Sequence, residues 1–323
     1  MAFYLGEATS ITFKTLPFIF LRLAIYFLFG LVFCIYWVLV YFVANAFASL
    51  HQYATVAIWV IAFLIPFPII RFLREYVFYV LKAGHVAVMA ELAITGKLPE
   101  GMGQIAWGKK QVMARFKQTS VLFLVDRLVA GVIAAINGVM WRVGHVFSGI
   151  PGVGGLVKLA NLVLRFSLTY VDEAILARNF VNEKETVWQS AKTGLVLYAQ
   201  IWRQVLATAL MLGIFAMLSY TVLAFVFLIP FLGFAQAIPG STPFFVIGAL
   251  VFAAVIKLAL FDPWTLANMM LVYLNETKNL AVDPVWEEKL ETFSKKFKEI
   301  KKRALGESGS CPLPQKVEGK NKI

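Results

Sequence analysis

Long apolar tracts alternate along this chain with short blocks of basic residues, and this alternation constrains the fold more than any other feature. Of the 30 lysines and arginines, 25 fall in four blocks, at 14–22, 71–117, 178–203 and 278–322. Three apolar tracts separate the blocks, and a short loop with almost no charge interrupts each tract. Because short basic loops stay on the cytoplasmic side of a membrane, the pattern predicts three helical hairpins that leave the cytoplasm and return. Both termini are then cytoplasmic.

The composition supports a chain whose solvent is a bilayer. Hydrophobic residues make up 60% of the sequence, charged residues only 15%, and the mean hydropathy is +0.76. Inside hydrocarbon each backbone polar group must be satisfied within its own segment, so the tracts should be helices. We expect an all-α, polytopic protein of the inner or plasma membrane, with residues 1–280 forming the transmembrane bundle. The six expected spans are 23–47, one that starts near Ala54, 120–143, 156–179, 204–232 and 243–273.

The cytoplasmic connections should be amphipathic. The segments 102–117, 186–203 and 285–303 mix aromatic and basic residues, as helices in the lipid headgroup region do. The residues expected at the membrane surface are Trp107, Trp188, Trp286, Lys295 and Lys296. Residues 281–305 should form one basic amphipathic helix, followed by a disordered tail at 306–323. Alternatively, this helix docks on the protein itself and not on the membrane.

The net charge of +12 therefore indicates membrane topology and attraction to anionic lipids, rather than nucleic-acid binding. Catalytic motifs are missing from the sequence. The chain has no Gly-x-x-x-x-Gly-Lys-[Ser/Thr] phosphate loop, no Gly-x-Ser-x-Gly elbow and no histidine spacing typical of a metal site. We expect no enzyme activity, no cofactor and no metal.

Ionisable residues inside the expected spans are the main candidates for function. A charge at bilayer depth costs at least about 2.5–3.5 kcal/mol on insertion scales, so such residues usually face a cavity or a partner. They are candidates for a substrate pathway, with a structural alternative in which they form ion pairs near the cytoplasmic interface. The set is Asp126 and Arg127 on the third span, Arg165, Asp172 and Glu173 on the fourth, and Lys257 on the sixth.

Two stretches resemble the choline transporter-like family. The third span begins with Val-Leu-Phe-Leu-Val-Asp-Arg-Leu at 121–128, and the fourth contains Tyr-Val-Asp-Glu-Ala at 170–174. The first is similar to a family segment in which an amphipathic helix runs into an apolar span that carries an aspartate followed by a basic residue. The second is similar to the Val-Asp within a later span of the family. The resemblance covers about residues 70–200. It implies transport of choline or a related amine, with Asp126 and Asp172 in the matching segments. This chain is shorter than family members and lacks their large external loop.

These observations lead to two hypotheses of function. The first is a small-solute or lipid-related transporter or permease that has no ATPase of its own. The second is a non-catalytic membrane subunit or scaffold that binds lipid, a protein partner or a second copy of itself.

Overall fold

A computed structural model describes residues 4–48, 52–116, 119–144, 170–182 and 184–308. All secondary structure in these ranges is helical, which confirms the predicted all-α class. The helices are α1 (Leu5–Lys14), α2 (Leu16–Ala48), α3 (Gln52–Leu64), α4 (Pro66–Phe72), α5 (Tyr79–Thr95), α6 (Gln104–Phe116), α7 (Thr119–Gly144), the helix 170–181, α9 (Val187–Gln200), α10 (Trp202–Ala235), α11 (Thr242–Ile256), α12 (Asp262–Thr277), α13 (Pro284–Phe293) and α14 (Lys295–Ser308). Two π-helical segments are η1 (Leu73–Phe78) and η3 (Lys257–Phe261).

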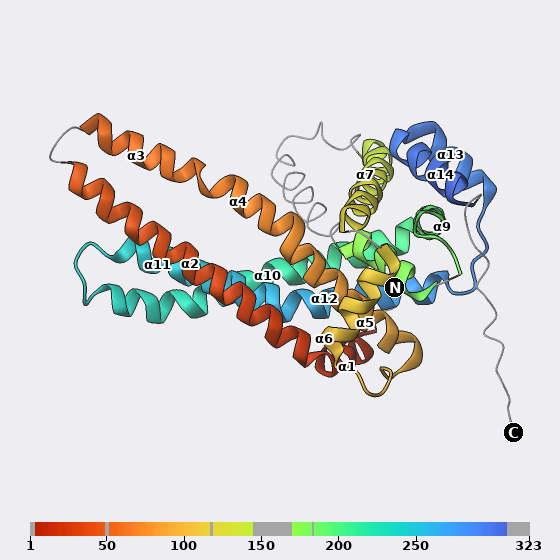
Figure 1. Ribbon diagram of the computed structural model, residues 1–323, viewed down its shortest axis with the longest axis horizontal. Coiled ribbons are helices and arrows are strands. Elements are labelled where there is room, and N and C mark those ends of the chain that lie inside the picture. The colour runs from red at the N-terminus through yellow and green to blue at the C-terminus, as the bar shows by residue number, and fades with distance from the viewer. Residues whose placement is uncertain (1–3, 49–51, 117–118, 145–169, 183, 309–323) are drawn as a thin grey trace, which may run out of the picture.

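Two long hairpins project from a helical body (Figure 1). The first is α2 followed by α3 and α4, and the second is α10 followed by α11. Their outward faces are covered with exposed aliphatic and aromatic side chains, such as Phe42, Phe63 and Ile229. Apolar side chains exposed on this scale are unfavourable in water and are expected of lipid-facing helices.

Among the described residues, four helices are long and apolar enough to cross a membrane. They are Leu16–Phe47, Thr55–Phe72, Trp202–Ala235 and Thr242–Thr277. The helices Gln104–Phe116 and Val121–Ile136 meet at an angle of 78°. Counted together as one bent span, they would be a fifth segment of sufficient length and apolar composition. A multi-pass membrane protein is therefore supported, whereas the predicted count of six spans is not confirmed.

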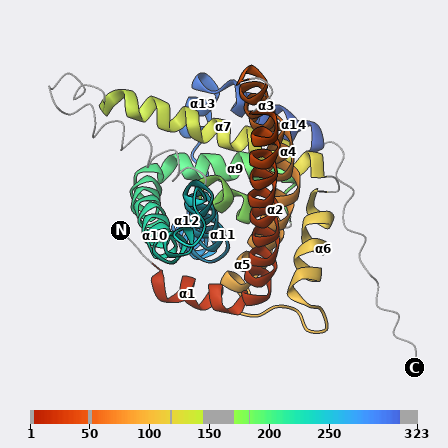
Figure 2. The same ribbon diagram turned by 90° about the vertical axis from the view of Figure 1, so that its left-hand side faces the viewer.

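Helix α7 matches the expected third span in its bounds but not in its direction. It covers Thr119–Gly144, yet it runs across the long axis of the molecule, whereas α10 and α11 are seen nearly end-on in the same view (Figure 2). It packs against α9 and α14 of the body. Most of the expected fourth span, 156–179, lies outside the described residues; its end belongs to the helix 170–181.

A break and two π turns interrupt the long helices of the described residues. The break lies at Ile65, between α3 and α4, and Pro66 and Pro68 follow it. Farther along the chain, η1 and η3 pack against α2, where Phe78 and Ala259 surround Tyr26. π turns are rare in proteins, and those that occur are often found at functional sites. The two π segments thus mark the level at which the hairpins join the body.

The body has the main hydrophobic core. It contains α1, α5, α6, α9 and α12, together with the inward faces of α7, α13 and α14. Glycines allow its closest helix crossing: a Cβ atom added to Gly108 on α6 would lie 2.6 Å from the carbonyl oxygen of Gly84 on α5. The body lies at the end of the molecule away from the turns of the hairpins (Figure 1).

Candidate functional site

A group of buried polar side chains lies where the hairpins join the body. We call it the junction cluster. It consists of Arg22 from α2, Tyr79, Lys82 and His85 at the start of the α5 segment, Asp126 from α7, Tyr170, Asp172 and Glu173 from the helix 170–181, Lys257 from η3 and Asp262 from α12.

Arg22 links three helices within this cluster. Its guanidinium is charged, but the residue is only 2% exposed. Nη1 contacts Nδ1 of His85 at 3.3 Å, and Nη2 donates to the carbonyl oxygen of Leu258 at 2.9 Å. The His85 ring in turn stacks on Phe18, with ring centroids 5.1 Å apart. Arg22 thus connects α2 to α5 and to η3.

The Leu258 carbonyl is free to accept because of the local sequence. In η3 the backbone N–H of Asp262 donates to the carbonyl of Lys257, five residues earlier. In the same register, the partner of Leu258 would be residue 263, which is a proline and has no N–H. A buried carbonyl without a donor is unfavourable, and Arg22 supplies that donor.

The same π turn brings Lys257 and Asp262 together. In an α-helix of 3.6 residues per turn, side chains five apart point about 140° away from each other. The wider π turn reduces this divergence, and Lys257 Nζ lies 2.7 Å from Asp262 Oδ1. The Tyr170 hydroxyl donates to the same carboxylate oxygen at 2.9 Å. Asp262 therefore joins η3 and α12 to the helix 170–181.

The other half of the cluster surrounds Lys82. Its ammonium forms an ion pair with Glu173, a residue that is only 3% exposed. The second carboxylate oxygen of Glu173 is buried and has no hydrogen-bond partner among the described residues. Lys82 also interacts electrostatically with Asp172 and Asp126, and the Tyr79 hydroxyl lies beside Asp126.

Electrostatic interactions connect the two halves. The Lys82 ammonium interacts with the charges of Arg22 and Asp262 as well as with the nearer carboxylates. Burial lowers the pKa of Lys82, the neighbouring Arg22 lowers it further, and the carboxylates of Asp172, Asp262 and Asp126 oppose that effect. Burial also lowers the pKa of His85, and Arg22 adds to that shift. Both effects favour the neutral imidazole of His85.

This protonation state assigns the His85 tautomer. Arginine can only donate, so Nδ1 of His85 must accept the contact from Arg22. The proton of the neutral ring then lies on Nε2, which is buried and has no partner in the described part of the chain. The cluster thus contains a buried imidazole N–H and a buried carboxylate oxygen that have no hydrogen-bond partner among the described residues.

The structure brings together four of the six residues predicted for a substrate pathway. Asp126, Asp172, Glu173 and Lys257 all belong to the junction cluster. Arg127, next to Asp126, is exposed and lies over the Phe123 ring at 4.8 Å. Arg165 lies outside the described residues.

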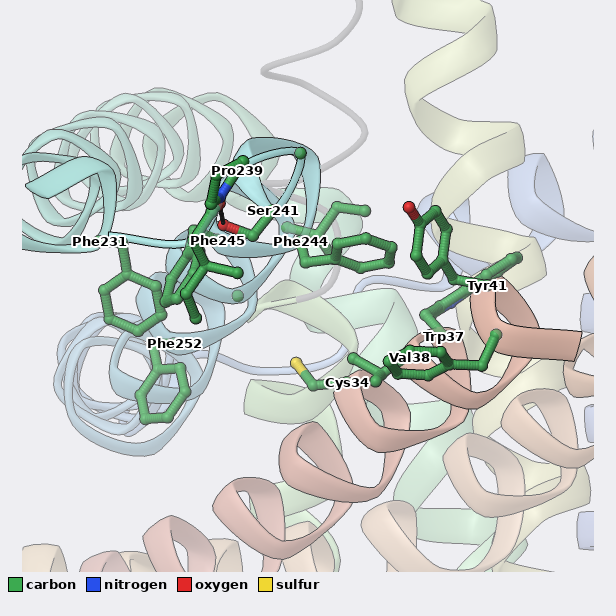
Figure 3. A pocket seen from close by; sticks show the side chains of 15 residues that line it. Cys34, Trp37, Val38, Tyr41, Phe231, Pro239, Ser241, Phe244, Phe245 and Phe252 are labelled. Atoms are coloured by element: carbon green, nitrogen blue, oxygen red, sulfur yellow. Dashed lines mark hydrogen bonds between the residues drawn. The ribbon is translucent and has the colours of Figure 1, made fainter. Parts of the chain in front are cut away.

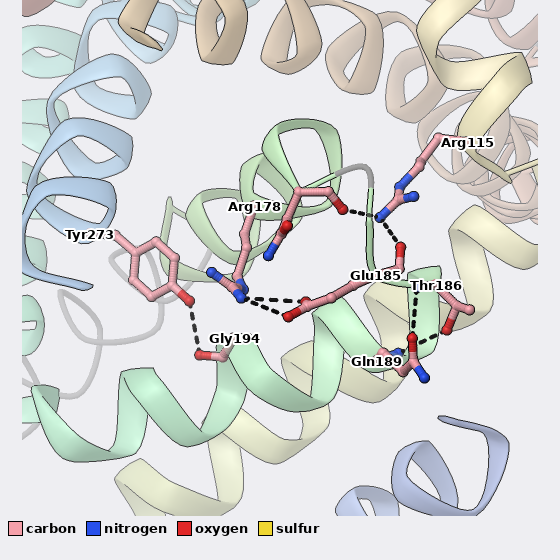
Figure 4. Close-up of polar contacts among 8 residues, drawn as sticks. Arg115, Arg178, Glu185, Thr186, Gln189, Gly194 and Tyr273 are labelled. Atoms are coloured by element: carbon pink, nitrogen blue, oxygen red, sulfur yellow. Dashed lines mark hydrogen bonds and ion pairs between the residues drawn. The ribbon is translucent and has the colours of Figure 1, made fainter. Parts of the chain in front are cut away.

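A second polar network positions the helix 170–181 (Figure 4). Arg115 of α6 donates to the carbonyls of Asn182 and Glu185 at 2.8 and 2.6 Å, and Arg178 pairs with the Glu185 carboxylate at 3.2 Å. The Tyr273 hydroxyl donates to the carbonyl of Gly194 at 2.9 Å. These side chains bind backbone or one another, so the network is structural. It fixes the helix that carries Tyr170, Asp172 and Glu173.

Thr186 caps the start of α9. Its hydroxyl accepts from the Gln189 N–H at 3.2 Å, and the Gln189 side chain accepts from the Thr186 N–H at 2.9 Å. This reciprocal arrangement is a capping box.

The residues expected at the membrane surface divide into two groups. Trp107 and Trp188 are buried in the core of the body, and the guanidinium of Arg303 lies over the Trp188 ring at 5.0 Å. Trp286 is half-buried, whereas Lys295 and Lys296 are exposed. The side chain of Lys296 crosses Gly131 of α7.

Sequence reasoning missed several members of the cluster. Arg22 and Lys82 fall in the basic blocks that were counted as cytoplasmic charge, and His85 looked isolated. Two local signals were available. Arg22 lies inside a helix that is otherwise apolar, and the Asp262–Pro263 pair follows Lys257 at a spacing that disrupts regular helix hydrogen bonding.

A comparison of this chain with models of known protein families, with curated proteins and with solved structures finds no match.

Proposed function

We propose that this protein is a transporter or permease for a small polar solute or a lipid-related molecule, in the inner or plasma membrane and without an ATPase of its own. The observation that carries the proposal is the junction cluster. Charged side chains from five segments, distant in sequence, meet at the inner end of the hairpins. Ionisable residues are costly to bury in a membrane protein, and where they gather they commonly mark the pathway of a transported group.

The proposed topology has both termini and the body on the cytoplasmic side. Its support is the concentration of basic residues in segments that belong to the body, while the hairpin turn at Gln236–Ser241 carries no charge. In this orientation the junction cluster faces the inner headgroup region. A solute that crosses between the hairpins would meet it at the cytoplasmic end.

The substrate class follows from the chemistry of the cluster and from the family resemblance. The described cluster holds four carboxylates, from Asp126, Asp172, Glu173 and Asp262, against three cations, and it has phenol rings from Tyr79 and Tyr170. Carboxylates and aromatic faces suit an organic cation. We therefore propose choline or a related amine as the first substrate to test.

Uptake into proteoliposomes tests this proposal. We expect uptake of labelled choline or another amine from a small panel, and its loss in Asp126→Asn and Asp172→Asn with thermal stability in detergent retained. Glu100→Gln, at an exposed position outside the cluster, is the control. If the two aspartates only form structural pairs, each variant should instead lose stability, by about 3–5 kcal/mol for a broken buried pair. Wild-type uptake in both variants would contradict the proposal.

A second candidate function is a non-catalytic membrane subunit or scaffold. The observation in its favour is the way α13 and α14 dock. Their apolar residues Leu290, Phe297 and Ile300 are buried in the body, and Lys295, Lys298 and Lys302 remain exposed on one basic surface. Such a surface attracts anionic lipid by about 1 kcal/mol per basic residue. Salt-sensitive binding of a partner or of anionic vesicles, with no uptake of any solute, would favour this candidate.

A further inference from the structure

An apolar cavity of about 520 Å³ lies between α2 and the α10–α11 hairpin, far from the junction cluster (Figure 3). Cys34, Trp37 and Val38 line it from α2, and Phe231 and Phe252 line it from the hairpin. It extends to the turn that joins α10 to α11, where Pro239 and Ser241 complete the lining.

Contacts between α2 and α11 bound this cavity at two levels. At the inner end α2 and α11 touch: a Cβ atom on Gly30 would lie 2.9 Å from Val251, and the rings of Phe27 and Phe252 are 5.5 Å apart. At the outer end the rings of Tyr41 and Phe244 meet edge to face at 4.7 Å. The two helices are therefore held apart between these contacts.

The length of the cavity matches one leaflet. Its lining on α2 runs from Cys34 to Phe42, which is about 12 Å at 1.5 Å per residue. Half of a hydrocarbon slab of about 30 Å is about 15 Å. If the hairpins cross the membrane, the cavity occupies the leaflet farther from the body.

The lining offers nothing to a charged or strongly polar ligand. Its walls are aromatic and aliphatic, and the Ser241 hydroxyl is already engaged, since it donates to the carbonyl of Ile238 at 2.6 Å. At the end near the α10–α11 turn, the Tyr41 hydroxyl and the backbone of the turn are polar. A ligand with an apolar body and a polar end fits this distribution.

We propose that this cavity binds one hydrocarbon chain of a membrane lipid, which enters sideways from the leaflet. The chain lies along α2 between the Gly30 and Tyr41 levels, with the lipid headgroup near the Ile238–Ser241 turn. Bulk lipid surrounds the cavity in a bilayer, its depth suits one acyl chain, and its walls exclude water-soluble ligands. This site is independent of the transport activity proposed above.

Photo-crosslinking in nanodiscs tests the proposal with a phospholipid that carries a diazirine in its acyl chain. Mass spectrometry should map adducts of the wild-type protein mainly to 34–42 and 244–252. Val38→Phe fills the cavity and should cause a several-fold loss of these adducts. Val32→Phe makes the same chemical change on an exposed face of α2 outside the cavity and should leave them intact.

Other outcomes would overturn the proposal. Adducts spread evenly over all exposed apolar faces would mean bulk contact only. Equal adduct yields in Val38→Phe and Val32→Phe would exclude the cavity as the site. If no lipid adducts form at the cavity and the protein is instead found as a dimer that buries these residues, a second copy of the chain fills the cavity. If Val38→Phe is not monodisperse, Cys34→Phe fills the cavity from a deeper position and serves in its place.

Discussion

Arg22 shows at the scale of a single residue how the hairpins are held to the body. Replacing it with Met keeps most of its length but leaves Nδ1 of His85 and the Leu258 carbonyl buried without a donor. Each buried polar group that loses its partner costs about 1–3 kcal/mol, so Arg22→Met should unfold at a lower denaturant concentration or temperature in detergent. Arg203→Met is the control, because Arg203 is exposed and contacts only the Trp202 ring among the interactions described. Equal stability of Arg22→Met and wild type would show that burying the guanidinium costs as much as its contacts gain.

The sequence predicted the site only in part, and the reason lies in individual residues. Asp126, Asp172, Glu173 and Lys257 were identifiable because each is charged within an apolar stretch. Arg22 and Lys82 fall within the blocks of basic residues, where a solvated position is the ordinary expectation. Their burial comes from helices distant in sequence, and no local pattern encodes which distant helices pack together.

At the scale of elements, close helix crossings depend on glycine. Gly108→Ala would place a methyl group 2.6 Å from the Gly84 carbonyl oxygen and 2.9 Å from the Phe18 ring. Since a backbone atom cannot move aside as a side chain can, α6 must shift away from α5 and stability should fall. Gly6→Ala is the matched control within a helix, because its added Cβ atom has open space around it. An alanine there should be neutral or stabilising by about 0.5–1 kcal/mol. Unfolding in detergent, compared for the two variants, checks the difference.

The docked C-terminal helices should respond to acid through Glu287. Its carboxylate lies 3.2 Å from Lys192 of α9 and 2.9 Å from Lys301 of α14. Partial burial raises the pKa of Glu287, but the hydrogen bonds from Lys301 and Lys192 outweigh burial and lower the pKa below its usual value. A lowered folded-state pKa means that the stabilisation is present above the unfolded pKa of about 4.3 and is lost as pH falls through the folded pKa.

Glu287→Gln should therefore be less stable than wild type at pH 7, and the difference should vanish as the pH is lowered past the folded pKa. Hydrogen exchange at pH 7 should increase in α13 and α14 of this variant. Glu288→Gln, at the neighbouring exposed position, should change neither quantity. A stability difference that persists unchanged in acid would contradict the role given to this carboxylate.

The boundaries of the helices depend partly on local sequence, which could be predicted, and partly on packing between distant segments, which could not. The expected long helices at 23–47 and 204–232 correspond to α2 and α10, since uninterrupted apolar sequence defines them. The expected single helix at 285–303 is instead two helices, α13 and α14. Ser294 is extended there, and its hydroxyl accepts from the N–H of Phe297 to begin the second helix. The break lets Leu290 and Phe297 both reach the core, a demand of tertiary packing that the amphipathic pattern alone does not contain.

At the scale of the whole molecule, the long helices are longer than a membrane is thick. The 33 residues of α2 extend about 50 Å, against about 30 Å of hydrocarbon. Part of α2 must therefore lie outside the apolar layer, and Arg22, near its start, is in that part if the hairpin turns mark the far side. The junction cluster then lies at the membrane boundary.

Helix α7 decides how many times the chain crosses. If α7 were a span, Ala134 near its centre would lie in hydrocarbon, and a cysteine there would not react with a water-soluble maleimide. We expect Ala134→Cys, in a chain with Cys34 and Cys311 replaced by serine, to be labelled from the cytoplasmic side. The reason is that Ala134 is exposed on a helix that runs across the molecule and packs on α9 and α14 (Figure 2). Ser241→Cys, in the turn between α10 and α11, should be labelled only from outside. Protection of Ala134→Cys from both sides would restore a third hairpin, and labelling of Ser241→Cys only from the cytoplasm would invert the topology.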